Sequence, residues 1–288
     1  MKIETVCVIG MGTMGSQIGI VCATAGYRTI MVDQNEQMVE KGLAGIKQFL
    51  GYLEKKGKIT ADKGKTALDR IETTTDKKKA FSFSEADFII EAVFEDMEVK
   101  KEIFKEMDQV CKEGAILASN TSTLSISEMA AVTSRPQNCI GTHFLIPAAL
   151  TPLVELVRAL QTSDETHERT IEFVKSCGKD TVTSSDSPAF IINRLYIPLG
   201  NEAFYLLQEG VATAEEIDKA CQLGLGLPLG PLAACDASGL DIALACAESM
   251  HRQLGDKYRP CPLLVKMVKA GRLGRKTGRG VYDYTKKK

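Results

Sequence analysis

The stretch Val6-Cys7-Val8-Ile9-Gly10-Met11-Gly12-Thr13-Met14-Gly15 decides the fold. An apolar run typical of a buried strand passes directly into three glycines with the spacing Gly-x-Gly-x-x-Gly. A helical pattern follows as far as Gly26, and a second apolar run, 29–32, ends at Asp33. A glycine motif alone is weak evidence for nucleotide binding. Strand, turn, helix, second strand and terminal carboxylate together form the dinucleotide-binding fingerprint.

Each of these residues has a physical role in binding a dinucleotide. Gly10 permits the tight turn, Gly12 lets the backbone approach a pyrophosphate at the helix N-terminus, and Gly15 allows the helix to pack closely on the strand. Asp33 follows Gly10 at about the separation expected of a carboxylate that holds a ribose 2′-hydroxyl. Because a carboxylate repels a 2′-phosphate, the sequence predicts NAD as cofactor. In the alternative, the glycines serve packing alone.

Composition excludes several classes of protein. A net charge of −1 in 288 residues and the absence of Trp argue against nucleic acid or an anionic membrane as partner. The nine cysteines are scattered without a Cys-x-x-Cys pair, which indicates separate thiols in a reducing compartment, with no metal site. No leader or membrane-length apolar run is present, so we expect a cytoplasmic protein.

The chain divides into two parts with different patterns. Strands and helices alternate as far as about residue 185, which predicts an α/β, Rossmann-type dinucleotide-binding domain over residues 1–185. Beyond the Ser/Asp/Pro stretch 184–188, helical patterns predict an all-helical C-terminal domain over 186–288. Besides the fingerprint, the expected strands are 88–93, 115–118, 139–143, 153–157, 180–183 and a tail strand at 280–284. The expected helices are 36–58, 61–70, 97–111, 189–209, 213–223, 240–254 and 263–269.

His143 and Glu155 each stand in a short apolar run that reads as a strand. Two such strands side by side would bring the carboxylate within hydrogen-bond reach of the imidazole. A histidine held in this way has a fixed tautomer and can take a proton at its other nitrogen near neutral pH. Two interpretations stand at this point: a catalytic base with its partner, or a structural pair.

Three lysines, Lys55, Lys56 and Lys58, cluster where the helix from residue 36 ends. They form either a solvated helix end or a clamp for a phosphate-bearing arm of the substrate. Their spacing alone favours the solvated end.

Several motifs, taken in order, resemble the L-3-hydroxyacyl-CoA dehydrogenases over nearly the whole chain. The resemblance implies NAD as cofactor, an acyl-CoA substrate, and His143 as the base that takes the 3-hydroxyl proton with Glu155 as its partner. The motifs are Gly10 to Gly15, Glu91-Ala92-Val93-Phe94-Glu95 with Lys100, Ser119-Asn120-Thr121-Ser122, Thr142-His143-Phe144, Leu153-Val154-Glu155, Pro188 to Arg194, Gly230-Pro231, Gly239-Leu240-Asp241 and Gly278 to Tyr282.

The same resemblance assigns roles to five further positions or clusters. It implies that Ser122 and Asn193 hydrogen-bond the reacting oxygen, and that Glu95 and Lys100 line the nicotinamide-ribose side of the cofactor site. It also changes the interpretation of Lys55, Lys56 and Lys58 to contacts with the phosphates of coenzyme A. From the residues alone, Ser122 reads as a helix N-cap and Asn193 as a polar residue that bends a helix.

One departure from the family pattern concerns the substrate. Ile146 stands where the family usually has an asparagine that touches the cofactor end of the site, and 148–152 also differs from the commonest form. The change removes a hydrogen bond and makes the pocket more apolar, which predicts an altered acyl preference or weaker activity on short substrates. Two other functions remain open: a dehydrogenase of a free hydroxy acid, and a non-catalytic NAD-binding relative.

The predicted helical domain has apolar residues on more than one helix face. About a hundred residues cannot bury so many faces internally, so we expect a homodimer joined through this domain, as the resemblance also implies. The apolar residues are Leu195, Ile197, Leu199, Ala203, Leu206, Leu223, Leu225 and Leu227.

Overall fold

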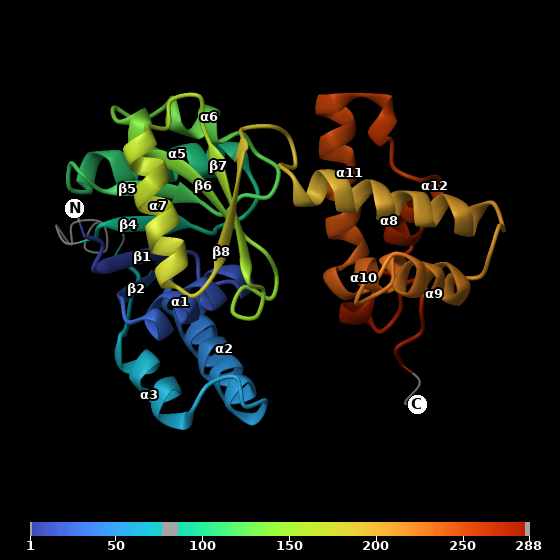
Figure 1. Ribbon diagram of the computed structural model, residues 1–288, viewed down its shortest axis with the longest axis horizontal. Helices are drawn as coiled ribbons and strands as arrows, with labels where there is room; N and C mark the ends of the chain where they lie inside the picture. Colours follow the sequence, from blue (N-terminus) through green and yellow to red (C-terminus); the bar gives the residue numbers. More distant parts are fainter. Residues whose placement is uncertain (1, 77–85, 286–288) are drawn as a thin grey trace. The chain divides into compact units, whose positions relative to one another are not determined.

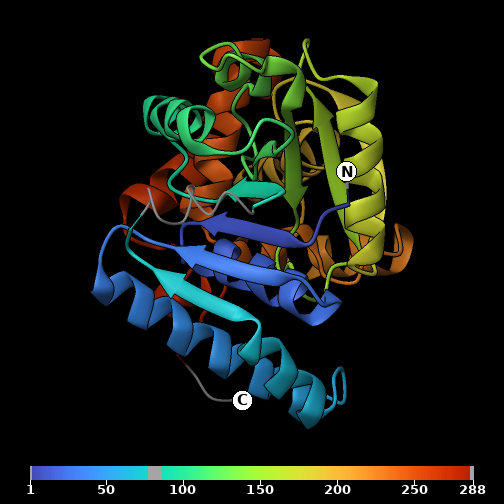
Figure 2. The ribbon, with the colours of Figure 1, turned by 90° about the vertical axis from the view of Figure 1, so that its left-hand side faces the viewer.

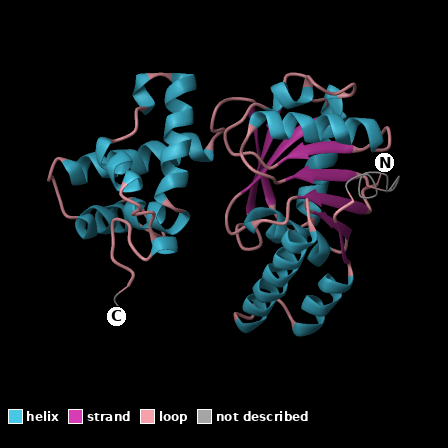
Figure 3. Cartoon of the chain, turned by 180° about the vertical axis from the view of Figure 1, so that it is seen from behind, coloured by secondary structure: helices cyan, strands magenta, loops and turns pink. Residues whose placement is uncertain are grey.

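The first two thirds of the chain are built on one eight-stranded sheet with the order β3-β2-β1-β4-β5-β6-β7-β8. The computed structural model describes residues 2–76 and 86–285, and the chain separates into two compact units, Met1–Ser187 and Pro188–Lys288 (Figure 1). All strands of the described residues lie in the first unit (Figure 3). They are β1 (Thr5–Ile9), β2 (Arg28–Val32), β3 (Ile71–Thr74), β4 (Phe88–Glu91), β5 (Ile116–Ser119), β6 (Cys139–Phe144), β7 (Leu153–Arg158) and β8 (Asp180–Ser185).

Neighbouring strands of this sheet pair in parallel, except for β6 and β7. β7 pairs antiparallel with β6, and β8 is parallel to β7. β1 has β2 on one side and β4 on the other, so the strand order reverses there, and ligands of such sheets bind outside the carboxyl ends at this point. Ile9, Glu91, Ser119 and Gly141 form a continuous register across four strands, so the ends of β1, β4 and β5 are level and β6 continues beyond them to His143 and Phe144.

Helices cover both faces of this sheet, which explains why its central strands are fully buried and nearly continuous in apolar residues (Figures 1 and 2). One core cluster joins β-strand residues such as Val8 and Ile90 to Ile18 of α1, Ile46 of α2 and Phe173 of α7. α2 lies beside the edge strand β3 (Figure 2). The helices are α1 (Thr13–Ala25), α2 (Glu36–Lys55), α3 (Ala61–Asp69), α5 (Met97–Val110), α6 (Ile126–Ala130) and α7 (Asp164–Ser176).

Some elements of the first unit differ from the sequence expectation. β3, α6 and α7 were not predicted, because β3 and α7 are largely polar and α6 is very short. The strand expected over 88–93 ends at Glu91, since the Val93 N–H donates to the Glu91 carboxylate at 2.7 Å and leaves the ladder.

The second unit is a helical bundle around a core that includes Phe204, Leu232 and Leu264. Its helices are α8 (Ile192–Gln208), α9 (Ala214–Gly224), α10 (Pro231–Ser238), α11 (Leu240–Leu254) and α12 (Pro262–Lys269). Within the described ranges, no helix combines the length and apolarity needed to cross a bilayer.

Two expectations for this unit were wrong. The helix expected from residue 189 begins at Ile192, because Ala189 and Phe190 have left-handed backbones with φ of 65° and 52°. The tail strand expected at 280–284 is absent from the described tail, which shows only isolated bridges. The Val281 and Tyr282 N–H groups instead donate to the buried carboxylate of Asp236, each at 2.9 Å.

Candidate active site

The glycine-rich turn lies between β1 and α1 at the carboxyl edge of the sheet. Gly10 has φ of 95°, and a Cβ there would lie 2.7 Å from the Ala92 carbonyl oxygen. A Cβ on Gly15 would lie 1.7 Å from the Gly10 carbonyl oxygen, so both positions require glycine for the protein's own packing. A Cβ on Gly12 would meet nothing within 4 Å. Gly12 therefore borders open space, where a ligand can approach the backbone.

The start of α1 is suited to an anion. Its N-cap, Gly12, provides no side-chain hydrogen bond, and no acidic residue stands in the first turn. The amide groups of that turn thus point their partial positive charge toward the open side of the turn. These features fit the pyrophosphate of NAD.

Asp33 is fixed beside this turn at the end of β2. Its Oδ2 accepts from the Met11 N–H at 2.7 Å, and its Oδ1 accepts from the Gln34 N–H, also at 2.7 Å. The half-buried carboxylate is therefore held against the glycine-rich turn, at the side where the fingerprint places a ribose.

The antiparallel pairing of β6 and β7 places His143 opposite Glu155. The imidazole Nδ1 and the Glu155 Oε2 are 2.7 Å apart, with His143 4% exposed and Glu155 fully buried. The next residue, Phe144, donates its N–H to the Asn120 side-chain oxygen at 2.9 Å. The strand that carries His143 is thus tied to the loop after β5.

That loop, residues 119–124, carries Ser122. The Ser122 backbone N–H donates to Glu95 Oε1 at 2.9 Å, and the half-buried residue lies at the carboxyl end of β5. Ser122 does not act as an N-cap, since the cap of α6 is Ser125, whose side chain accepts from the Glu128 N–H.

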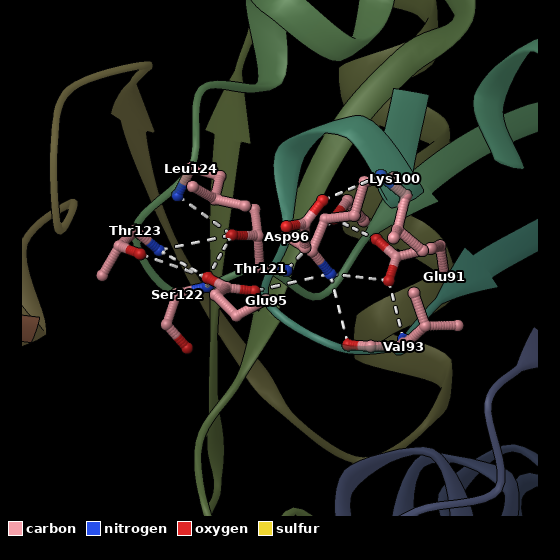
Figure 4. A network of polar contacts seen from close by, with 11 residues as sticks. Glu91, Val93, Glu95, Asp96, Lys100, Thr121, Ser122, Thr123 and Leu124 are labelled. Atoms are coloured by element: carbon pink, nitrogen blue, oxygen red, sulfur yellow. Dashed lines mark hydrogen bonds and ion pairs between the residues drawn. The ribbon is translucent and has the colours of Figure 1, made fainter. Parts of the chain in front are cut away.

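Lys100 is buried and faces carboxylates (Figure 4). Its ammonium lies 2.6 Å from Glu91 Oε1 and 3.4 Å from Glu95 Oε2. Glu91 belongs to the motif Glu91-Ala92-Val93-Phe94-Glu95, but no role was predicted for it. A charged residue inside the apolar run Phe88-Ile89-Ile90-Glu91 was nevertheless a signal, because a buried carboxylate requires partners.

The remaining predicted site residues lie at the end of α2 and on α8. Lys55, Lys56 and Lys58 are exposed at the end of α2, where the Lys56 ammonium lies 5.9 Å from the centre of the Tyr52 ring. Asn193 is half-buried in the first turn of α8, in the second unit. In the described part of the chain, no group of His, Cys, Asp and Glu is arranged to hold a metal ion.

Comparison with protein families matches both units. The NAD binding domain of 3-hydroxyacyl-CoA dehydrogenase matches residues 5–187, and the C-terminal domain of the same enzyme matches residues 190–284. The chain belongs to the 3-hydroxyacyl-CoA dehydrogenase family. The expectations of a Rossmann-type unit followed by a helical one, of NAD as cofactor, and of an oxidoreductase are thereby confirmed for this dehydrogenase.

Individual members of this family are similar to the chain over nearly its whole length. A probable 3-hydroxybutyryl-CoA dehydrogenase of Bacillus subtilis is 46% identical over 288 residues, covering 100% of this chain and 99% of the relative. The human mitochondrial hydroxyacyl-coenzyme A dehydrogenase is 37% identical over 289 residues, and the match covers 98% of this chain and 91% of the human protein. The crystal structure of a (S)-3-hydroxybutyryl-CoA dehydrogenase of Ralstonia eutropha matches with a TM-score of 0.92 at 45% identity, over 99% of this chain and 100% of that one.

Proposed function

We propose that the chain catalyses the reversible NAD-dependent oxidation of an L-3-hydroxyacyl-CoA to the 3-ketoacyl-CoA, with short acyl groups as the first candidates. The buried His143–Glu155 pair carries this proposal, because it stands at the same sheet edge as the glycine-rich turn. The names of the relatives, several of them 3-hydroxybutyryl-CoA dehydrogenases, support the choice of short chains. Bound NAD would supply the hydride acceptor.

His143 acts as the general base in this proposal. Glu155, when ionised, accepts from the Nδ1–H and so selects the tautomer in which Nε2 can take the proton of the 3-hydroxyl. Burial of the pair strengthens the attraction between Glu155 and the imidazolium that forms. In the reverse direction the imidazolium returns the proton to the alkoxide oxygen.

Ser122 and Asn193 are proposed to hydrogen-bond the reacting oxygen, and Glu95 and Lys100 to line the cofactor site. Neutral donors suit an oxygen that alternates between hydroxyl and carbonyl. The Ser122 backbone is fixed by Glu95, which supports a defined position for its hydroxyl. Lys100 is only 1% exposed, so we propose that it shapes this lining by holding Glu95 in place.

The substrate's coenzyme A arm is proposed to bind at Lys55, Lys56 and Lys58. Their exposure at the end of α2 leaves three positive charges accessible to phosphate groups. In the β6–β7 connection, Ile146 and Leu150 are 57% and 38% exposed. Because these side chains are exposed and apolar, we propose that they contact the acyl group and that the enzyme also accepts acyl groups larger or more apolar than acetoacetyl.

The test is the oxidation of NADH by the purified protein with acetoacetyl-CoA and a series of longer or ring-bearing 3-ketoacyl-CoA thioesters. We expect turnover with the thioesters and none with free acetoacetate. Equal rates with free acetoacetate would favour a dehydrogenase of free hydroxy acids. NADH binding without turnover on any thioester would favour the non-catalytic role.

A further inference from the structure

We propose that Glu91 is a positioning residue for the reaction. It does not touch the substrate, but acts through Lys100 and Glu95 to fix the loop of residues 119–124, which carries Ser122. This role rests on the proposed function of Ser122 in binding the reacting oxygen.

Glu91 joins three elements at the end of β4. Its Oε1 accepts from the Lys100 ammonium on α5 at 2.6 Å and from the Val93 N–H at 2.7 Å. Its Oε2 accepts from the Ser119 hydroxyl on β5 at 2.7 Å. Ser119 Oγ in turn accepts from the Thr121 N–H at 3.1 Å. Glu91 thus holds the beginning of the loop through Ser119.

A second arm reaches the same loop through Lys100 (Figure 4). The ammonium lies 3.4 Å from Glu95 Oε2, which leaves Glu95 Oε1 directed at the loop. That oxygen accepts from the Thr121 hydroxyl at 2.5 Å, the Ser122 N–H at 2.9 Å and the Thr123 N–H at 3.1 Å. Both the Ser119 hydroxyl and the Glu95 carboxylate, which hold the loop, are therefore linked to Glu91.

Stability alone gives no reason for this arrangement. Two fully buried charges, Glu91 and Lys100, cost desolvation energy, and apolar residues of similar volume often stabilise a protein equally well. Apolar residues, however, cannot orient Glu95. Without the charge on Glu91, the ammonium of Lys100 has Glu95 as its remaining carboxylate and draws it away from the loop amides. The Ser122 hydroxyl then loses its fixed position.

The first experiment compares Glu91→Gln with the wild-type enzyme in NADH oxidation by a 3-ketoacyl-CoA. Misplacement of a group by about 1 Å can cost roughly 100-fold in rate, so we expect kcat to fall by about 10- to 100-fold. This fall should exceed any rise in the KM for NADH that the displaced Glu95 causes. Lys101→Met is the matched control, because Lys101 is the next residue on α5 and pairs with Glu98 and Glu128. The control should keep its kcat.

The double variant Glu91→Gln/Lys100→Met separates positioning from stability. It removes both buried charges, so its melting temperature should return toward the wild-type value even if Glu91→Gln alone folds poorly. Its kcat should stay low, because Glu95 has lost the ammonium that orients it. Recovery of kcat together with the melting temperature would overturn the proposal.

A double-mutant cycle with Ser122→Ala identifies the target of the network. In that background Glu91→Gln should cost little further, since the hydroxyl that it positions is gone. If the two substitutions lower kcat independently, so that their fold-losses multiply in the double variant, the positioning role of Glu91 is overturned. Ser122 then keeps its place in the mechanism. An unchanged kcat in Ser122→Ala alone would instead remove Ser122 from the proposed function, and the positioning role with it.

Discussion

At the residue scale, we propose that the reaction depends on the buried His143–Glu155 pair. His143→Gln keeps a polar side chain of similar size but cannot accept the proton, so we expect turnover to fall about 10²- to 10⁴-fold while NADH still binds. Glu155→Gln should cost nearly as much, because the imidazolium loses its counter-charge. Steady-state rates and NADH fluorescence titration measure both effects.

The control for this pair is His167→Gln. His167 lies on α7, where its Nε2 is 2.8 Å from the Thr183 hydroxyl, and its loss should leave the rate unchanged. A His143→Gln rate above a tenth of wild type at neutral pH would exclude His143 as the base. An unchanged rate and pH profile in Glu155→Gln would show that the pair is structural.

Asp33 is proposed to set the choice between NAD and NADP. Its carboxylate, held by the Met11 and Gln34 N–H groups, would repel a 2′-phosphate at the ribose that it is proposed to bind. We expect kcat/KM to be far higher with NADH than with NADPH, and the ratio to shrink in Asp33→Ser. Equal values for the two cofactors in the wild-type enzyme would mean that Asp33 does not face the ribose.

At the element scale, Asp87 joins the beginnings of β1 and β4. It accepts from the Glu4 N–H at 2.8 Å and the Thr5 N–H at 3.0 Å, and it pairs with Lys112. Burial raises the pKa of Asp87, but the Lys112 ammonium and the two N–H groups outweigh burial and hold the pKa below its usual value. A lowered pKa in the folded state means that Asp87 stabilises the fold above the unfolded-state pKa, and that this contribution is lost as the pH falls.

The expected outcome is a pH-dependent difference between wild type and Asp87→Asn. The difference in free energy of unfolding, measured with urea, should be constant at neutral pH and shrink below about pH 4, where an unfolded aspartate begins to protonate. Asp69→Asn, at the exposed end of α3, is the matched control and should show only a small difference. If the difference in free energy of unfolding between wild type and Asp87→Asn does not change with pH, the lowered pKa of Asp87 is contradicted.

Elements with a strong pattern of their own were predictable from the sequence. The fingerprint of β1, α1 and β2 follows from local residues, and α11 was predicted with its observed bounds, Leu240–Leu254. The start of α8 and the conformation of the tail were not, because left-handed residues at 189–190 and the Asp236 carboxylate decide them. These depend on tertiary contacts that no local pattern encodes.

In the candidate site, too, some features follow from local sequence and others depend on tertiary contacts. Short apolar runs indicated that His143 and Glu155 could meet, since the pair needs only two neighbouring strands. The proposed role of Glu91 could not be predicted from the sequence. Its contacts with Ser119 and Lys100 depend on the register of β4 with β5 and on the packing of α5.

At the scale of the whole molecule, exposed apolar side chains in the second unit support the prediction of a homodimer. Leu195, Leu223 and Leu225 are 70%, 78% and 64% exposed in the single chain. Ala203 is buried and Leu206 packs on the core of the same unit, so these two residues do not contribute to the exposed surface. The remaining surface is suited to a symmetric contact with a second copy.

Sedimentation at micromolar concentration should therefore report about twice the chain mass. Leu223→Asp/Leu225→Asp should shift the enzyme to the monomer, because two carboxylates would be buried without partners. Leu160→Asp is the control: Leu160 is 91% exposed but lies in the first unit, and its replacement should leave the dimer intact. A wild-type monomer with full activity would contradict the prediction.

The antiparallel joining of β6 to β7 has a consequence for how this enzyme can acquire new substrates. The pairing of His143 with Glu155 is set by strand register, whereas the connection at 145–152, with Ile146 and Leu150, lies outside the ladder. Insertions or grafts in this connection leave the two side chains opposite each other, while a single-residue insertion within either strand would turn one of them to the other face of the sheet. Evolution and protein engineering therefore have one segment that can diversify without disturbing the proton transfer.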